Sequence, residues 1–186
     1  SLIALSGGAA HYGIENHEDL DLFIITKPHT VYIVYFLIHL YSVIFGVRDI
    51  LCANYLIDER DLKIDYPHDP YIAHQVISLT ALRNERMLQR FWNENEWVKE
   101  YFPNFKFKKV EKQNPSALYF IFKPLNKILM TLYRMRYLNK SDNIDSADSL
   151  KLNPQCIKLH TNDHRYKIMN AFKIAWEEYN KSYKMS

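Results

Sequence analysis

The sequence is poor in cysteine, glycine and proline: its 186 residues include two, four and seven of them, respectively. Two cysteines, Cys52 and Cys156, are too few for a disulfide framework or a four-thiolate zinc site. A reducing compartment suits them best, and we expect the protein in the cytoplasm. So few glycines and prolines exclude collagen-like and low-complexity chains. With 48% hydrophobic residues, the chain has enough apolar material for the core of an ordinary domain.

Long apolar runs are also missing. The longest, residues 31–45, covers about fifteen mostly apolar or aromatic residues and contains His39, whereas a transmembrane helix needs about 20 apolar residues. We therefore predict a buried core helix there and no transmembrane segment. The run lies inside the chain without a basic leader or a cleavage pattern, so it is not a secretory signal.

The order of hydrophobic patterns predicts an α/β (α+β) fold with a mixed sheet. Apolar or alternating segments favour three strands, over residues 2–6, 19–26 and 50–57. We expect these strands and the helix at 31–45 to form a core over residues 1–66. Because the chain starts at once on an apolar strand, we also expect that core to lack its N-terminal part.

The remainder of the chain, residues 67–186, is expected to be mostly helical and to pack on or beside the core. Apolar residues recur there at spacings of three and four, which is the period of an amphipathic helix. The helical patterns cover residues 72–92, 118–138 and 168–183. Pro124 predicts a break or kink in the second of them.

Charge is unevenly distributed along the chain. Residues 1–104 carry a net charge of −6, whereas residues 105–140 carry nine basic residues and the single acid Glu111. Aromatic residues are interleaved with these cations, a combination that suits a nucleic-acid acceptor. Contact with an anionic membrane, or simple solvation of helices packed on the acidic half, explains the same pattern. All three interpretations stay open.

The sharpest chemical signal is the pair Gly7-Gly8 followed by Asp19-x-Asp21. Residues two apart on a strand project from one face, so the two carboxylates would lie side by side and repel each other. A divalent cation such as Mg²⁺ resolves that repulsion, and a glycine turn lets backbone N–H groups approach a phosphate. The alternative is a solvated acidic strand edge. A Walker loop is excluded because no Lys-Ser/Thr follows the glycines.

These residues resemble the DNA-polymerase-beta-like nucleotidyltransferase superfamily, whose signature is a Gly-Gly or Gly-Ser turn followed by Asp-x-Asp on the next strand. Residues 1–104 look in particular like bacterial nucleotidyltransferase-domain proteins of uncharacterised substrate. The segments that carry this narrower resemblance are Leu5-Ser6-Gly7-Gly8, the strand Asp19 to Thr26, Cys52-Ala53-Asn54-Tyr55, Trp97-Val98 and Phe102-Pro103-Asn104.

The resemblance implies a nucleotidyltransferase that passes an NMP unit from an NTP to an unknown acceptor. Asp19 and Asp21 would be the catalytic residues and the ligands of Mg²⁺, or of Mn²⁺ in its place. The nucleotide would be held by Ser6, Gly7, Gly8 and Asn54. A nucleic acid that meets the basic stretch 105–140 is one candidate acceptor.

The sequence departs from the family pattern on the third strand, which normally supplies a third carboxylate. Asn54 is the polar residue inside this strand, and an amide adds no charge and cannot act as a base. Asp49 and Asp58 flank the strand and would substitute only in another register. The alternative is therefore a catalytically inactive module that keeps the fold for nucleotide binding or protein interaction.

Overall fold

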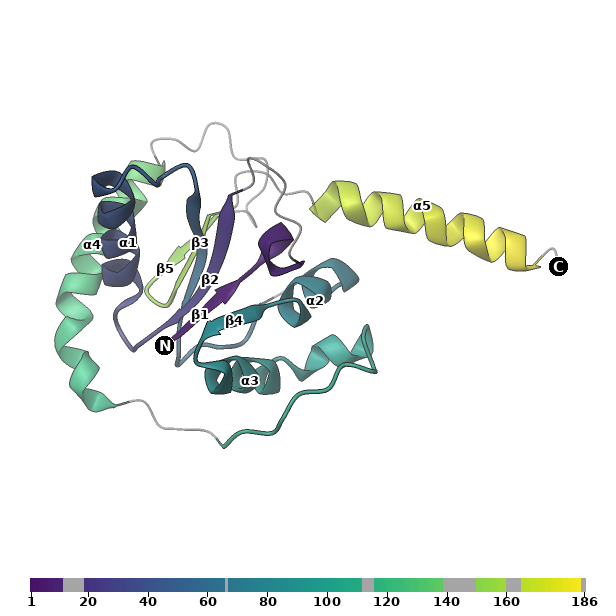
Figure 1. Ribbon diagram of the computed structural model, residues 1–186, viewed down its shortest axis with the longest axis horizontal. Coiled ribbons are helices and arrows are strands. Elements are labelled where there is room, and N and C mark those ends of the chain that lie inside the picture. The colour runs from purple at the N-terminus through teal and green to yellow at the C-terminus, as the bar shows by residue number, and fades with distance from the viewer. Residues whose placement is uncertain (12–18, 66, 112–115, 139–149, 160–164, 185–186) are drawn as a thin grey trace.

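The protein is built on a mixed sheet, six strands of which lie in the described part of the chain, with helices on both faces (Figure 1). The computed structural model describes residues 1–11, 19–65, 67–111, 116–138, 150–159 and 165–184. Among these residues the strand order is β4-β1-β2-β3-β6-β5, with β2 and β3 parallel and the other neighbouring pairs antiparallel. The strands are β1 (Leu2–Leu5), β2 (Leu20–Thr26), β3 (Leu51–Asp58), β4 (Thr80–Arg83), β5 (Leu150–Asn153) and β6 (Cys156–Leu159). The α/β character expected from the sequence is confirmed.

The helices divide between the two faces of the sheet (Figure 1). One face is covered by α1 (Val31–Ile44) and α4 (Lys123–Leu138), the latter preceded by the 3₁₀ helix η3 (Ala117–Phe122). The other face is covered by α2 (Pro70–Ile77), α3 (Glu85–Glu94) and the 3₁₀ helix η2 (Glu96–Glu100). A short 3₁₀ helix, η1 (Gly7–His11), follows β1, and α5 (Arg165–Lys184) extends away from the sheet.

Strand β2 is buried on both sides, which gives the protein two hydrophobic cores. Phe23 and Ile25 pack with α2 and α3 in one core, and Leu22 and Ile24 pack with α1 and α4 in the other. This follows from the two-residue period of a strand, which sends successive side chains to opposite faces. A strand that reads as a continuous apolar run is the pattern expected for a strand covered on both faces.

Helix boundaries follow local capping chemistry. Asp69 accepts a hydrogen bond from the backbone N–H of Ile72 at 2.8 Å, and Pro70 occupies the first turn of α2. The same carboxylate forms an ion pair with Arg165 at 2.6 Å, which connects the start of α5 to α2. Helix α1 instead begins at Thr30 without a side-chain cap of its own.

A residue of α4 supplies the cap that α1 lacks. The side chain of Asn126, which is 3% exposed, accepts a hydrogen bond from the backbone N–H of Tyr32 at 2.8 Å. Its amide nitrogen donates to the carbonyl of Pro154 at 3.4 Å. Asn126 therefore satisfies one of the unpaired N–H groups of a helix start and joins α1, α4 and the β5–β6 turn.

The structure corrects the sequence analysis after residue 66. The strands expected near 2–6, 19–26 and 50–57 are confirmed, as is the helix near 168–183. Strands β4, β5 and β6 were missed, although all three belong to the same sheet as β1, β2 and β3. Each has only four residues, too few for a two-residue period to stand out from the helical spacing around it.

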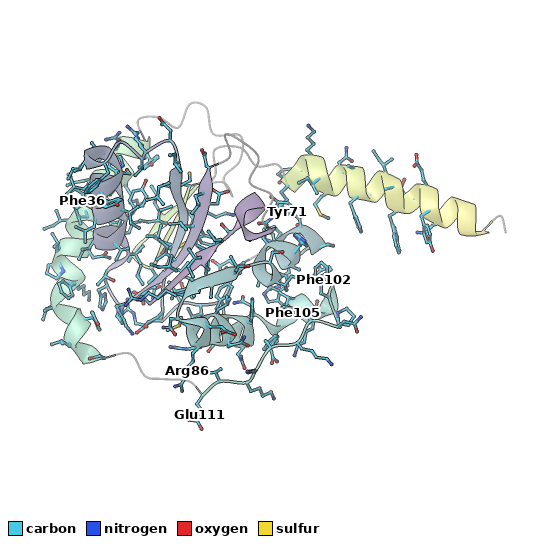
Figure 2. All side chains as sticks on the ribbon, viewed as in Figure 1. Phe36, Tyr71, Arg86, Phe102, Phe105 and Glu111 are labelled. Carbon is cyan, nitrogen blue, oxygen red and sulfur yellow. The ribbon has the colours of Figure 1, made fainter. Side chains whose placement is uncertain are left out.

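Helix α1 is confirmed, but the prediction that it is buried along its whole length is wrong. Val31 and Tyr32 are fully buried, whereas Leu37 is 55% exposed and Ile44 is 66% exposed. Phe36, labelled on this helix in Figure 2, is also exposed. Within the described ranges, none of the helices combines the length and the apolar character needed to cross a membrane.

The cap across α1 and α4 can be tested by substitution. We expect Asn126→Leu to lower the free energy of unfolding by about 1–3 kcal/mol, because the N–H of Tyr32 loses its partner while it stays buried. Urea denaturation measures this loss. Lys127→Leu, at the exposed neighbouring position, is the control and should change stability by about 0.5 kcal/mol or less. Equal losses in the two variants would contradict the assigned role.

Candidate functional site

The glycine turn lies directly against the carboxylate strand. The backbone N–H of Ser6 donates to the carbonyl of Asp21 at 3.0 Å, and the Ser6 hydroxyl reaches the same oxygen at 3.4 Å. A Cβ atom added to Gly7 would stand 2.8 Å from Oδ2 of Asp21. These residues are distant in the sequence, so the contact is made by the fold.

Strand pairing explains why they meet. Leu5 pairs with Leu22 in the antiparallel β1–β2 ladder, so the end of β1 adjoins the beginning of β2. Gly7 adopts a φ of +60°, in the left-handed region that disfavours residues with a Cβ. Both the backbone conformation and the nearby carboxylate therefore require glycine at this position, and Gly8 next to it is exposed.

The two aspartates occupy different environments. Strand β2 begins at Leu20, so Asp19 precedes the strand and is exposed, whereas Asp21 lies inside it and is partly buried. The expectation that both project from one regular strand is therefore corrected for Asp19. They remain neighbours at the same end of the sheet, on the side reached from the Ser6-Gly7-Gly8 turn.

The parallel β2–β3 pair brings the beginning of β3 to the same end. Asp21 pairs with Cys52, and the register then shifts because β3 has one extra residue before Tyr55 pairs with Phe23. Bulges of this kind are over-represented beside functional sites. The backbone of Asn54 lies in this irregular part of β3, but its side chain lies outside the part of the structure that is described.

Asp58 does not belong to this site. It pairs with Thr26, five residues along β2 from Asp21, and that separation corresponds to about 16 Å of strand. The carboxylate is fully buried and accepts hydrogen bonds from the Arg60 guanidinium, at 2.6 and 2.9 Å, and from the backbone N–H of His29. The hydrogen bond to the Asp58 carboxylate raises the pKa of the Arg60 guanidinium. The suggestion that Asp58 completes a carboxylate triad is therefore wrong.

Of the two acids that flank β3, Asp49 is the one that lies at the same end of the sheet as Asp21. It is exposed in the turn before β3, one residue before Ile50, whose carbonyl accepts a hydrogen bond from the N–H of Leu20 at 2.7 Å. Over the described part of the chain, no group of three or more His, Cys, Asp or Glu side chains is arranged around a common cation position. His17 and the side chain of His11, which lie between the glycines and Asp19 in the sequence, fall outside the described residues.

The basic stretch 105–140 does not form one surface. Phe105 packs edge-to-face on Trp92 of α3, with ring centroids 5.1 Å apart. Residues 105–111 run past α3 (Figure 2). The cations of α4 lie on the opposite face of the sheet, where α4 packs beside α1. The described cations of residues 105–140 are close together in the sequence, but the fold divides them between the two faces of the sheet.

A second group of polar residues was not identified from the sequence. Arg48, Arg136 and His39 line one pocket between α1, α4 and the beginning of β3. From the sequence, His39 belongs to the helix predicted over residues 31–45, and Arg136 is one of the cations of the basic stretch 105–140. Their convergence depends on the packing of α4 against α1, and no spacing along the chain encodes it.

Comparison of the chain with protein-family models, with curated proteins and with solved structures found no match.

The close approach of Gly7 to Asp21 predicts an unequal effect of two glycine substitutions. Gly46 has a similar φ of +64°, but nothing lies within 4 Å of an added Cβ there. Both Gly→Ala variants should lose about 1–2 kcal/mol to the left-handed conformation. Gly7→Ala should lose up to about 1 kcal/mol more, because its methyl group must displace the Asp21 carboxylate.

Urea denaturation of the two alanine variants measures this difference. Gly46→Ala serves as the matched control for backbone strain alone. If the two variants lose the same stability, the tight contact between the turn and Asp21 does not exist in solution.

Proposed function

We propose that this protein is a nucleotidyltransferase that transfers an NMP unit from an NTP to an acceptor hydroxyl. The observation that carries the proposal is the direct apposition of the Ser6-Gly7 turn and Asp21 at one end of the sheet. A phosphate-binding turn and a carboxylate pair are the two parts that such chemistry needs side by side. Their meeting supports the proposal because it joins segments that are separated in the sequence.

Each residue has a specific task in the proposed reaction. Asp19 and Asp21 would hold Mg²⁺, or Mn²⁺, with carboxylate oxygens, and the exposed position of Asp19 leaves it accessible to a hydrated cation. The bound cation would neutralise negative charge on the triphosphate. The Ser6 hydroxyl can turn to donate to a phosphate oxygen, while Gly7 and Gly8 present backbone without side chains.

The proposed chemistry is an in-line displacement at the α-phosphorus. The acceptor oxygen forms the new bond to phosphorus, pyrophosphate leaves, and the acceptor proton passes to a base or to solvent. The Asp21 carboxylate lies beside the turn that would hold the phosphates, so it is the base candidate that the fold positions best. Asn54 would contact the nucleotide from β3 as a neutral group.

An inactive nucleotide-binding or protein-interaction module is the second candidate. It is favoured by the position of Asp58, which is engaged by Arg60 at the far end of β3 and leaves that strand without a carboxylate beside Asp21. Such a module would bind the nucleotide with Ser6, Gly7 and Gly8 and would not transfer it.

Two further parts of the proposal concern location and acceptor. Two cysteines, Cys52 and Cys156, are too few for a disulfide framework, which supports a reducing, cytoplasmic environment. A nucleic-acid acceptor would meet the cations of α4, such as Lys123 and Lys127, because these lie one helical turn apart. The membrane and solvated-surface interpretations predict no nucleic-acid binding there.

Nucleotide binding tests the proposal. With Mg²⁺ present, a non-hydrolysable NTP should bind the protein in titration calorimetry, and Asp21→Asn should weaken binding about tenfold or more because one cation-binding charge is lost. Glu100→Gln, at an exposed position of η2, is the control and should bind as the wild type does. Unchanged binding in Asp21→Asn would refute the assigned metal site.

Transfer is measured separately, by the incorporation of labelled NMP from each NTP in a cell lysate. Wild-type protein should label an acceptor and Asp21→Ala should not. Nucleotide binding without any labelling would favour the inactive module, and equal labelling by both proteins would exclude catalysis through Asp21.

A further inference from the structure

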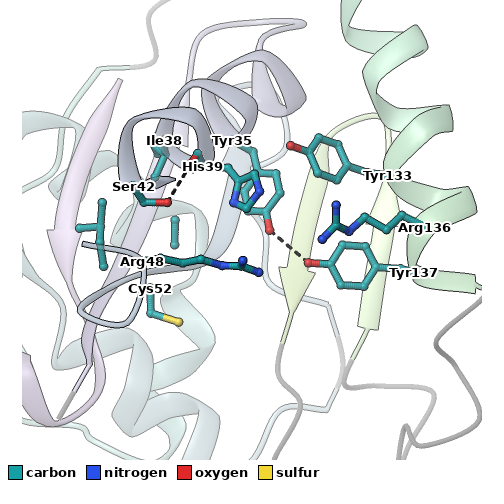
Figure 3. Close-up of a pocket in the computed structure, with 11 residues that line it drawn as sticks. Tyr35, Ile38, His39, Ser42, Arg48, Cys52, Tyr133, Arg136 and Tyr137 are labelled. Atoms are coloured by element: carbon teal, nitrogen blue, oxygen red, sulfur yellow. Dashed lines mark hydrogen bonds between the residues drawn. The ribbon is translucent and has the colours of Figure 1, made fainter. Parts of the chain in front are cut away.

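A pocket of about 150 Å³ lies between α1, α4 and the beginning of β3 (Figure 3). Helix α1 contributes Tyr35 and His39, the turn before β3 contributes Arg48, and α4 contributes Arg136 and Tyr137. Figure 3 shows the side chains of Arg48, Arg136 and His39 directed toward the same space. The pocket is therefore built from segments that are far apart in the sequence.

The lining carries positive charge without a compensating acid. Residues 31–48 and 116–138, which include both packed helices, contain no Asp or Glu. Within the described residues, neither Arg48 nor Arg136 forms an ion pair with a carboxylate. Burial and the charges of these two arginines lower the pKa of His39. Unpaired guanidinium groups that converge on one cavity are an arrangement suited to an anion.

Neutral donors complete the lining. The hydroxyls of Tyr35 and Tyr137 lie 3.2 Å apart and connect α1 to α4. Burial raises the pKa of Tyr35, so its hydroxyl stays protonated and able to donate. Ser42 is buried and donates to the carbonyl of His39 at 2.8 Å, which fixes the turn of α1 that carries the imidazole.

We propose that this pocket binds a phosphate group, held by Arg48 and Arg136. Guanidinium groups present N–H donors in a planar fork that matches phosphate oxygens. Two guanidinium groups also match the two negative charges of a phosphate dianion, whereas a carboxylate ligand carries only one. His39 and the tyrosine hydroxyls supply further donors at the wall. Sites for small ligands commonly combine an aromatic lining with a few convergent polar groups in this way.

The phosphate site is distinct from the proposed nucleotide site. Leu22 belongs to the core on the α1 side, so Asp21, its neighbour on β2, projects to the other face of the sheet. Both sites lie at the same end, because Cys52 in the pocket wall pairs with Asp21. The proposal does not depend on nucleotidyl transfer.

The phosphate can belong to a small soluble molecule or to a lipid headgroup. Exposed apolar side chains on the same two helices, such as Leu40, Tyr41 and Met135, would lie against a lipid surface if the headgroup were the source. The chemistry of the pocket is the same in both cases, and the experiment separates them.

Inorganic phosphate is the first probe, titrated at constant ionic strength with backbone amide shifts as the readout. It should bind saturably and shift the amides of α1 and the β3 start. Arg136→Gln and Arg48→Gln should each weaken binding at least tenfold. Arg134→Gln, an exposed arginine of α4 that does not line the pocket, should leave it unchanged. If acetate binds as well as phosphate, or if Arg134→Gln weakens binding as much as Arg136→Gln, the proposal is overturned.

Vesicles provide the second arm. Flotation with phosphatidylcholine vesicles is compared with and without phosphatidic acid, for wild type, Arg136→Gln and Arg134→Gln. Retention that requires phosphatidic acid and Arg136, but not Arg134, assigns a lipid headgroup as the source. Binding of free phosphate without vesicle retention assigns a soluble ligand. If neither free phosphate nor phosphatidic acid binds through Arg136, the pocket is not a phosphate site.

Discussion

The rest of the structure depends on the parallel pairing of β2 with β3. Parallel strands cannot be joined by a tight turn, so the chain must leave the end of β2, cross one face of the sheet as α1 and return to the same end to start β3. Because β2 is apolar on both sides, the opposite face must be covered as well, and α2 and α3 do this. The three-layer arrangement follows from this single pair.

The same pairing collects the polar chemistry at one end of the sheet. The beginnings of β2 and β3 lie side by side there, and antiparallel β1 ends beside them. The Ser6-Gly7 turn, Asp21 and the wall of the pocket that contains Arg48 and Arg136 therefore become neighbours. The strand alternation then separates them by face, with Asp21 on one side and the pocket on the other. The proposed cation site and the proposed phosphate site therefore involve opposite faces of the sheet at the same end.

The far end of the same strands has a structural role. Asp58 and Glu59 are both buried and are paired with Arg60 and Lys27, respectively. A buried carboxylate is tolerated when its oxygens are hydrogen-bonded, and Asp58 accepts hydrogen bonds from the backbone N–H groups of His29 and Arg60 as well as from the guanidinium. The position of an acid along the paired strands β2 and β3 therefore decides which partners it meets, although Asp21 and Asp58 are chemically the same.

The sequence by itself determined the strands β1, β2 and β3, the helices α1 and α5, and the proximity of Asp19 and Asp21, because these depend on local apolar patterns and on short separations along the chain. Only the tertiary structure decided that β4, β5 and β6 join the sheet, since their own residues show no clear two-residue period and their hydrogen-bonded neighbours define them as strands. It also decided that the outer half of α1 stays exposed and that Arg48 meets Arg136. Local patterns encode which face of an element is apolar, whereas the partner that covers this face is chosen by packing across the whole fold.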